Sequence, residues 1–132
     1  MIVQESDAVI ASARSRRPST SPQLLCIAGF DGWFKSVSTS WEVALDYSSG
    51  ELRSRSFYDY IHPDDVADTM DVVRRLASGW SDGGMQNRFR RRDGTYRRLL
   101  WAEPIVKDRA FFAVASDVTG VDERLIKRYL RD

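Results

Sequence analysis

The sequence predicts an α+β domain with one five-stranded antiparallel sheet and short helices packed on one of its faces. Two Asp-Gly turns, at residues 31–32 and 93–94, are each flanked by β-rich segments, as expected for hairpins. Residues 39–78 lie between these turns and have helical rather than alternating apolar spacing. Strands at both ends with helices in the middle favour a single sheet that the helical segment covers on one side.

The composition is that of one ordinary soluble domain. With 132 residues, of which 42% are apolar and 30% charged, the chain can bury a single core without disulfides. The formal net charge of +1 gives no general attraction to nucleic acid or to an anionic membrane. No apolar run approaches the roughly 20 residues that span a bilayer, and the first residues lack the pattern of a secretion signal. Cys26 is the only cysteine, so we expect a cytoplasmic domain without an internal disulfide.

The first 23 residues are predicted to form a short amphipathic helix and a linker. Apolar side chains recur at helical spacing over residues 2–13. Residues 14–23 are rich in Arg, Ser and Pro, and Pro18 and Pro22 cannot continue a helix. The folded domain is therefore expected to begin near Leu24.

The first hairpin is expected over residues 24–38, where two short β-rich segments meet at the first Asp-Gly turn. Spacing then becomes helical, and Thr39 or Ser40 can cap the helix that carries Trp41 on its apolar face. Gly50 is expected in a loop beyond this helix.

The clearest helix is expected over residues 63–78, after a short helical turn at residues 56–61. Pro63 suits the first helical position, where its missing N–H costs nothing, and two aspartates follow in the first turn. Asp71 and Arg75 are expected to form an ion pair on the solvent side. The residues of the predicted buried stripe are Val66, Met70, Val73 and Ala77.

His62 is the only histidine, and the four aspartates in the following nine residues give this segment the look of a metal or acid–base site. A metal would need carboxylates that converge on one point. Helical spacing instead spreads these carboxylates over a convex, solvated surface. We therefore expect a structural or capping role for His62 and predict no metal site, with a haem ligand or a partner contact as the alternatives.

Three further strands and a closing helix are expected after the glycine-rich residues 79–84. The second hairpin covers residues 85–106, the last strand residues 109–119 and the helix residues 120–132. Both sides of the last strand are apolar, so we expect the helices to cover one face and the N-terminal helix, a second subunit or both to cover the other. One side carries Phe112, Val114 and Val118, and the other carries Phe111, Ala113 and Ala115.

Four motifs in this order resemble the landmarks of PAS domains, the small sensory modules of signalling proteins. They are FDGWFKSVSTSWEVALDYSSGEL, YIHPDDV, FRRRDGTYRRLLWAEPI and ASDVT. The resemblance implies a sensory domain over residues 24–119, flanked by the N-terminal helix and linker (residues 1–23) and by a signalling helix (residues 120–132). Flavin-adduct photochemistry in this family needs a cysteine on the helical segment, whereas Cys26 lies on the first predicted strand.

In the PAS architecture the space between the helices and the sheet can hold a flavin, haem, fatty acid or small organic ligand. Large side chains lie on the predicted core faces here, and they either fill the core or line such a pocket. The absence of a clear anchor favours no cofactor, or a small apolar or aromatic ligand, over haem or flavin. Trp41 and Trp101 are the preferred wall residues. The candidate pocket residues are Phe34, Trp41, Leu45, Tyr58, Ile61, Met70, Val73, Phe89, Trp101 and Phe112.

Asp117 and Thr119 match the junction between the last strand and the exit helix of PAS domains. Such side chains can satisfy backbone groups at a strand–helix junction, which couples the position of the strand to the angle of the helix. We therefore predict that this junction transmits a signal.

Residues 88–98 contain six arginines and one aspartate, a local charge of +5. Alternation favours a hairpin whose solvent-side residues are arginines. An acidic partner domain is the first alternative. Nucleic acid is the second, because Phe89 and Tyr96 interleave with the arginines and could stack on bases.

Together these features predict a PAS-type sensory and dimerisation module of a bacterial-style signalling protein. It would bind a small ligand or a protein partner and relay the change through the C-terminal helix to an effector domain. The expected partner is a second copy, bound through the N-terminal helix and the outer sheet face, and neither a membrane nor nucleic acid is expected. The alternative is a ligand-free adaptor. An enzyme is not favoured, because one His at a helix start and one Cys on a strand make no catalytic constellation.

Overall fold

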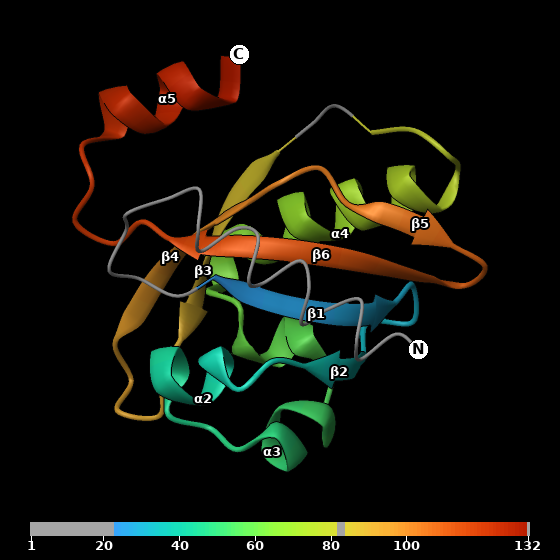
Figure 1. The fold of residues 1–132 in the computed structure, drawn as a ribbon, viewed down its shortest axis with the longest axis horizontal. Helices are drawn as coiled ribbons and strands as arrows, with labels where there is room; N and C mark the ends of the chain where they lie inside the picture. Colours follow the sequence, from blue (N-terminus) through green and yellow to red (C-terminus); the bar gives the residue numbers. More distant parts are fainter. Residues whose placement is uncertain (1–22, 82–83, 132) are drawn as a thin grey trace.

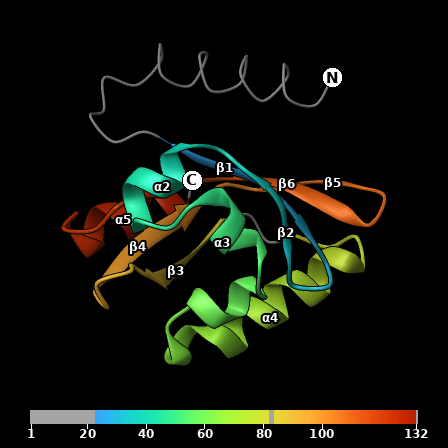
Figure 2. The ribbon, with the colours of Figure 1, turned by 90° about the horizontal axis from the view of Figure 1, so that it is seen from below.

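The structure is a computed structural model that describes residues 23–81 and 84–131, with side chains up to residue 128. One antiparallel sheet forms a layer, and helices cover one of its faces (Figures 1 and 2). This is the predicted α+β arrangement. The covering helices are α2 (Ser40–Leu45), α3 (Ser49–Arg53), the 3₁₀ turn η1 (Phe57–Tyr60) and α4 (Pro63–Ala77).

The strand order across the sheet is β2-β1-β6-β4-β3, with β5 beside β6. The sheet therefore has six strands where five were predicted, because the strand expected after the second Asp-Gly turn is divided. Its first part, β4, pairs with the end of β6, and its second part, β5, pairs with the beginning of β6. Pro104 lies between the two parts and has no N–H for the ladder. The strands are β1 (Leu24–Gly29), β2 (Phe34–Val37), β3 (Met85–Arg90), β4 (Tyr96–Trp101), β5 (Ile105–Lys107) and β6 (Ala110–Asp117).

Helix α3 corrects the prediction of a loop around Gly50. Ser48 accepts a hydrogen bond from the Glu51 backbone N–H, and the Glu51 side chain accepts one from the Ser48 N–H. This reciprocal capping box stabilises a helix of only five residues despite its glycine. Leu52 is the residue of α3 that is fully buried in the core.

The exit helix α5 (Glu123–Arg131) follows β6 and lies beside the sheet rather than among the covering helices (Figure 1). The helix predicted over residues 2–13 and nearly all of the linker after it lie outside the described residues. In the part of the chain that is described, no helix is both long and apolar enough to cross a membrane.

Aromatic side chains form the centre of the core. Trp41 of α2 is 0% exposed, and its Nε1–H donates to the Leu25 carbonyl at 2.9 Å. Its ring centroid lies 5.0 Å from that of Phe34, 5.5 Å from Phe89 and 6.0 Å from Trp101. These tilted and edge-on contacts hold α2 against the sheet.

Candidate functional site

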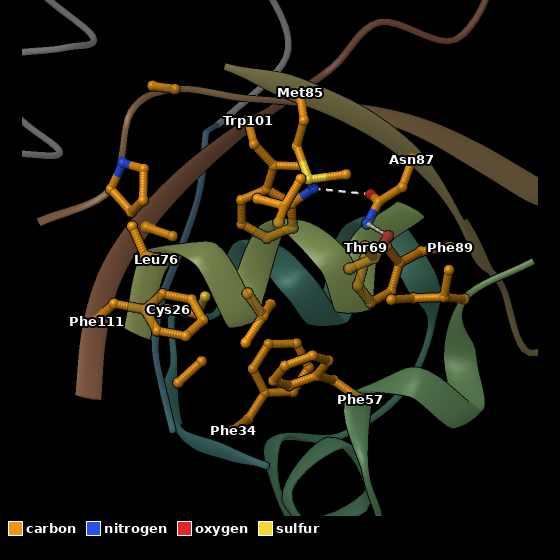
Figure 3. Close-up of a pocket in the computed structure, with 17 residues that line it drawn as sticks. Cys26, Phe34, Phe57, Thr69, Leu76, Met85, Asn87, Phe89, Trp101 and Phe111 are labelled. Carbon is orange, nitrogen blue, oxygen red and sulfur yellow. Dashed lines mark hydrogen bonds between the residues drawn. The ribbon is translucent and has the colours of Figure 1, made fainter. Parts of the chain in front are cut away.

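A cavity of about 70 Å³ lies between helix α4 and the inner face of the sheet (Figure 3). Met85 and Trp101 lie at one end of it, and Phe34 and Phe57 lie at the other. Its wall is almost entirely apolar, which is typical of sites for small organic molecules. The wall residues are Cys26, Ala28, Phe34, Phe57, Ile61, Thr69, Val72, Val73, Leu76, Met85, Asn87, Phe89, Trp101, Ala102, Pro104, Phe111 and Ala113.

The structure brings together half of the predicted pocket residues. Trp41 and Leu45 are buried in the core but do not line the cavity. Tyr58 is half-buried beside the core and is also outside the wall. The predicted residues that do line the cavity are Phe34, Ile61, Val73, Phe89 and Trp101.

Met70 was predicted to face the core, but it is 48% exposed. Ala77 of the predicted stripe is also exposed. Compared with the predicted stripe, the buried stripe is rotated around the helix by about one residue, so that Thr69 faces the core in place of Met70. The Thr69 hydroxyl donates to the Asp65 carbonyl at 2.8 Å, so this polar side chain is buried with its hydrogen bond satisfied. The buried residues of α4 are Thr69, Val73 and Leu76.

Phe112 was also predicted to face the core, whereas the structure places its neighbour Phe111 in the cavity wall. The inner side of β6 carries Phe111, Ala113 and Ala115, and the outer side carries Phe112 and Val114. Strand alternation places the two alanines on the same inner side as Phe111. Small side chains on the central strand leave room for the cavity.

A chain of hydrogen bonds crosses the cavity wall, and the sequence did not reveal it. Trp101 Nε1–H donates to Asn87 Oδ1 at 2.8 Å, and Asn87 Nδ2–H donates to Thr69 Oγ1 at 3.2 Å. Asn87 is two residues before Phe89 on the same strand, and this spacing could have predicted that Asn87 faces the core, since both residues lie on the inner face of β3. Cys26 in the wall was also missed, and burial raises the pKa of its thiol to about 12. The thiol is therefore neutral and is not a nucleophile at ordinary pH.

Asp65 connects α4 to β3 beside this chain. Its carboxylate accepts hydrogen bonds from the Arg88 backbone N–H at 2.8 Å and from the Arg88 guanidinium at 2.8 and 2.9 Å. The hydrogen bonds from the guanidinium hold the pKa of Asp65 below its ordinary value. From the sequence, Asp65 was predicted only to lie in the first helical turn, because the partner strand is distant in the chain.

His62 caps helix α4, as predicted. Its Nδ1 accepts the Asp64 N–H at 3.0 Å. The predicted ion pair between Asp71 and Arg75 forms at 2.7 Å, and Arg74 joins it. No group of three or more metal-ligating side chains occurs among the residues that the structure describes. The segment from Ile61 to Arg75 thus starts and forms helix α4, and Ile61 and Thr69 within it line the cavity.

Four of the six arginines of the second hairpin form ion pairs with acidic side chains from four different elements: α3, α4, β6 and α5. Arg92, for example, donates to Glu51 and lowers the pKa of that carboxyl to about 2. Much of the local positive charge is therefore neutralised within the domain, as an acidic partner would otherwise do. The pairs are Arg88–Asp65, Arg92–Glu51, Arg97–Asp117 and Arg98–Glu123.

The junction after β6 is tied to β4 by side-chain and backbone hydrogen bonds. Asp117 Oδ1 accepts from the Thr119 N–H at 3.0 Å and from its hydroxyl at 2.6 Å, while Oδ2 accepts from Arg97 Nε at 2.8 Å. The Thr119 hydroxyl oxygen accepts from the Arg98 N–H, and the Val118 N–H donates to the Arg98 carbonyl, each at 2.8 Å. A shift of β4 against β6 would therefore move the start of the exit helix.

The family model for the PAS fold matches residues 34–110, more than half of the chain. No curated protein matches the sequence. Among solved structures, the PAS domain of the RpfR quorum-sensing receptor of Cronobacter turicensis, in complex with BDSF, is 13% identical with a TM-score of 0.64. That match covers 77% of this chain and 99% of the other.

Two further solved PAS domains have similar folds. The PAS domain of an HTR-like protein from Haloarcula marismortui is 21% identical, with a TM-score of 0.58 over 89% of this chain and 99% of the other. The PAS-B domain of Drosophila melanogaster Cycle, with bound ethylene glycol, is 20% identical, with a TM-score of 0.57 over 70% of this chain and 94% of the other. The order of the elements, the sheet topology and the family match together show that the chain belongs to the PAS fold family.

Proposed function

We propose that this PAS domain is a sensory and dimerisation module that binds a small apolar or aromatic ligand and relays the change through its exit helix. The carrying observation is the apolar cavity between α4 and the sheet. Similar domains with bound small molecules support the proposal: RpfR is in complex with BDSF in one structure and with C12:0 in another. The domain itself would have no catalytic activity and would work in the cytoplasm, with an effector domain or partner protein reading the helix.

The size of the cavity limits what it can hold. Its volume of about 70 Å³ is roughly half that of an engineered apolar cavity of about 150 Å³ that binds benzene. Haem or flavin would therefore need a large rearrangement of the wall, and we propose neither as a cofactor. The same small volume is the observation that favours the alternative, a ligand-free adaptor whose core is simply packed.

The proposed dimer uses the outer face of the sheet together with the N-terminal helix. Ile27 pairs in register with Phe112, and Phe112 pairs with Ile105 on its other side, so apolar side chains form a row across β1, β6 and β5. Ile105 is 66% exposed. An apolar row of this kind on a sheet face is typical of a surface that another element or subunit covers.

Native mass spectrometry of the purified protein, together with its absorbance spectrum, tests the proposal. We expect a colourless dimer that carries extra mass from a small ligand, and we expect Ala113→Leu to remove that mass by filling the cavity from β6. Ala67→Leu on the exposed side of α4 is the matched control and should keep it. A bare mass for the wild type, also after incubation with small apolar compounds, would favour the adaptor, and a monomer at micromolar concentration would contradict the dimer.

Asp117→Ala is expected to abolish the signal dependence of output while the domain stays folded. The substitution removes the acceptor for three hydrogen bonds at the junction and should cost about 1–2 kcal/mol of unfolding free energy. Output of the intact protein, with and without signal, is the measurement, and circular dichroism confirms the fold. Asp68→Ala, at an exposed position of α4, is the control. Unchanged signal dependence in the Asp117 variant would show that the junction does not transmit.

A further inference from the structure

Asn87 places an amide in a wall that is otherwise nearly all apolar (Figure 3). It is only 4% exposed, and it makes two hydrogen bonds within the described part of the chain, to Trp101 and to Thr69. Thr69 in turn donates to the Asp65 carbonyl, and the Trp101 ring packs against Trp41 and Phe89, so both neighbours of the amide are themselves held in place. The orientation of the amide is therefore determined before any ligand enters.

The hydrogen bonds of Asn87 leave part of its capacity unused. A side-chain amide has two N–H donors and an oxygen with two lone pairs. Trp101 uses one lone pair and Thr69 uses one N–H, so within the described residues one donor and one acceptor of this buried amide remain. Each polar atom of the amide already has one partner, and the remaining donor and acceptor suit a further group that both donates and accepts. A hydroxyl group has this property.

The cavity offers no partner for a charged ligand. None of its wall residues has a side chain that is ionised at neutral pH, since burial keeps the Cys26 thiol protonated. Arg88, the nearest arginine along the strand from Asn87, is bound by Asp65 and is not part of the wall. A carboxylate or an ammonium group in this cavity would lose its hydration without gaining an opposite charge.

We infer that Asn87 selects a neutral ligand with one hydroxyl group on a small apolar body. The hydroxyl donates to the free lone pair of Asn87 Oδ1 and accepts from the free N–H of Nδ2, while the apolar body packs against the surrounding aromatic side chains. This inference rests on the proposed ligand-binding function and narrows the chemical class of the ligand.

Four probes of similar size separate the contributions of charge and hydrogen bonding: 1-butanol, 1-chlorobutane, butanoate and butylammonium. Asn87 is the only asparagine in the chain, so protein labelled with ¹⁵N-asparagine reports on this amide directly in an NMR titration at pH 7. We expect 1-butanol to shift the side-chain NH₂ signals and to bind about fivefold more tightly than 1-chlorobutane. Butanoate and butylammonium should bind at least about tenfold more weakly than 1-butanol.

Asn87→Leu should bind 1-butanol and 1-chlorobutane equally, as measured by NMR with uniform ¹⁵N labelling. Gln86→Leu on the outer side of the same strand is the matched control and should keep the preference for the alcohol. If all four probes bind the wild type equally, or if 1-butanol leaves the Asn87 amide signals unchanged, the inference about Asn87 is wrong and the cavity still binds ligands. If no probe binds the wild type, the proposed ligand-binding function itself is contradicted. The wild-type titration decides between these results even if Asn87→Leu does not fold.

Discussion

Trp41→Ala is expected to lower the free energy of unfolding by about 3–5 kcal/mol. Trp41 is fully buried, its ring contacts three other aromatic side chains, and its indole N–H satisfies the Leu25 carbonyl. Truncation would leave a void where α2 meets the sheet and would also leave that carbonyl without its partner. A domain of this size has a total stability of roughly 5–15 kcal/mol, so the loss is a large share of it.

Denaturant unfolding followed by far-ultraviolet circular dichroism measures this effect without relying on tryptophan fluorescence. Trp33→Ala is the matched control, because Trp33 is 40% exposed on the turn between β1 and β2, and it should cost no more than about 0.5 kcal/mol. Trp41→Phe separates packing from hydrogen bonding and should fall between the two, at about 1–2 kcal/mol. If Trp41→Ala and Trp33→Ala lower the free energy of unfolding equally, the packing of Trp41 in the core does not make the expected contribution to stability.

Asp65→Ala is expected to cost about 2 kcal/mol at neutral pH. The carboxylate accepts three hydrogen bonds from Arg88, one of them from the backbone N–H of β3, and it is mostly buried. Its removal leaves that N–H and the guanidinium without their acceptor and loosens α4 from the strand that carries Asn87. Because the pair is partly exposed, the cost is below that of breaking a fully buried ion pair.

Asp71→Ala is the matched control on the same helix. Asp71 pairs with Arg74 and Arg75 at the surface, where such pairs contribute only a few tenths of a kcal/mol. Chemical denaturation of both variants at pH 7 makes the comparison. A loss for Asp65→Ala that does not exceed the loss for Asp71→Ala would mean that the contact with Arg88 does not hold the helix to the sheet.

The contribution of Asp65 should also depend on pH. Its pKa is lowered in the folded state, chiefly by the hydrogen bonds from Arg88, relative to an unfolded value near 3.9. A group of this kind stabilises the fold fully above the unfolded pKa and loses that contribution as the pH falls through the folded pKa. The difference in stability between the wild type and Asp65→Asn should therefore be constant from pH 7 to about pH 5 and should shrink below about pH 4. A difference that stays constant down to pH 2 would contradict this assignment.

Local rules were sufficient wherever a short segment determines its own structure. The Asp-Gly turns, the start of α4 at Pro63 and the cap at His62 depend on neighbouring residues and were predicted correctly. The same rules missed α3, whose capping box depends on Ser48 and Glu51 despite an intervening glycine. They also treated Pro104 as part of one strand, where it separates two.

Side-chain orientation within an element was harder to predict than the element itself. On α4, an apolar stripe through Met70 and one through Thr69 differ by a single residue, and apolarity alone favours Met70. The preference reverses because Thr69 has a local acceptor and Asn87 as a partner from β3. On β6 both sides are apolar, so alternation could not decide between Phe111 and Phe112.

The sequence by itself determined the fold class, the order of the main elements apart from α3 and the division into β4 and β5, and membership of the PAS fold family, because turns, caps and periodicity are short-range properties that the chain carries locally. Only the tertiary structure decided where the cavity lies, that Asn87 lines it, and which acidic side chains pair with four of the arginines of the second hairpin. Those features depend on side chains from distant elements that compete for the same space and the same hydrogen-bond partners. That competition is settled only when α4 packs on the sheet.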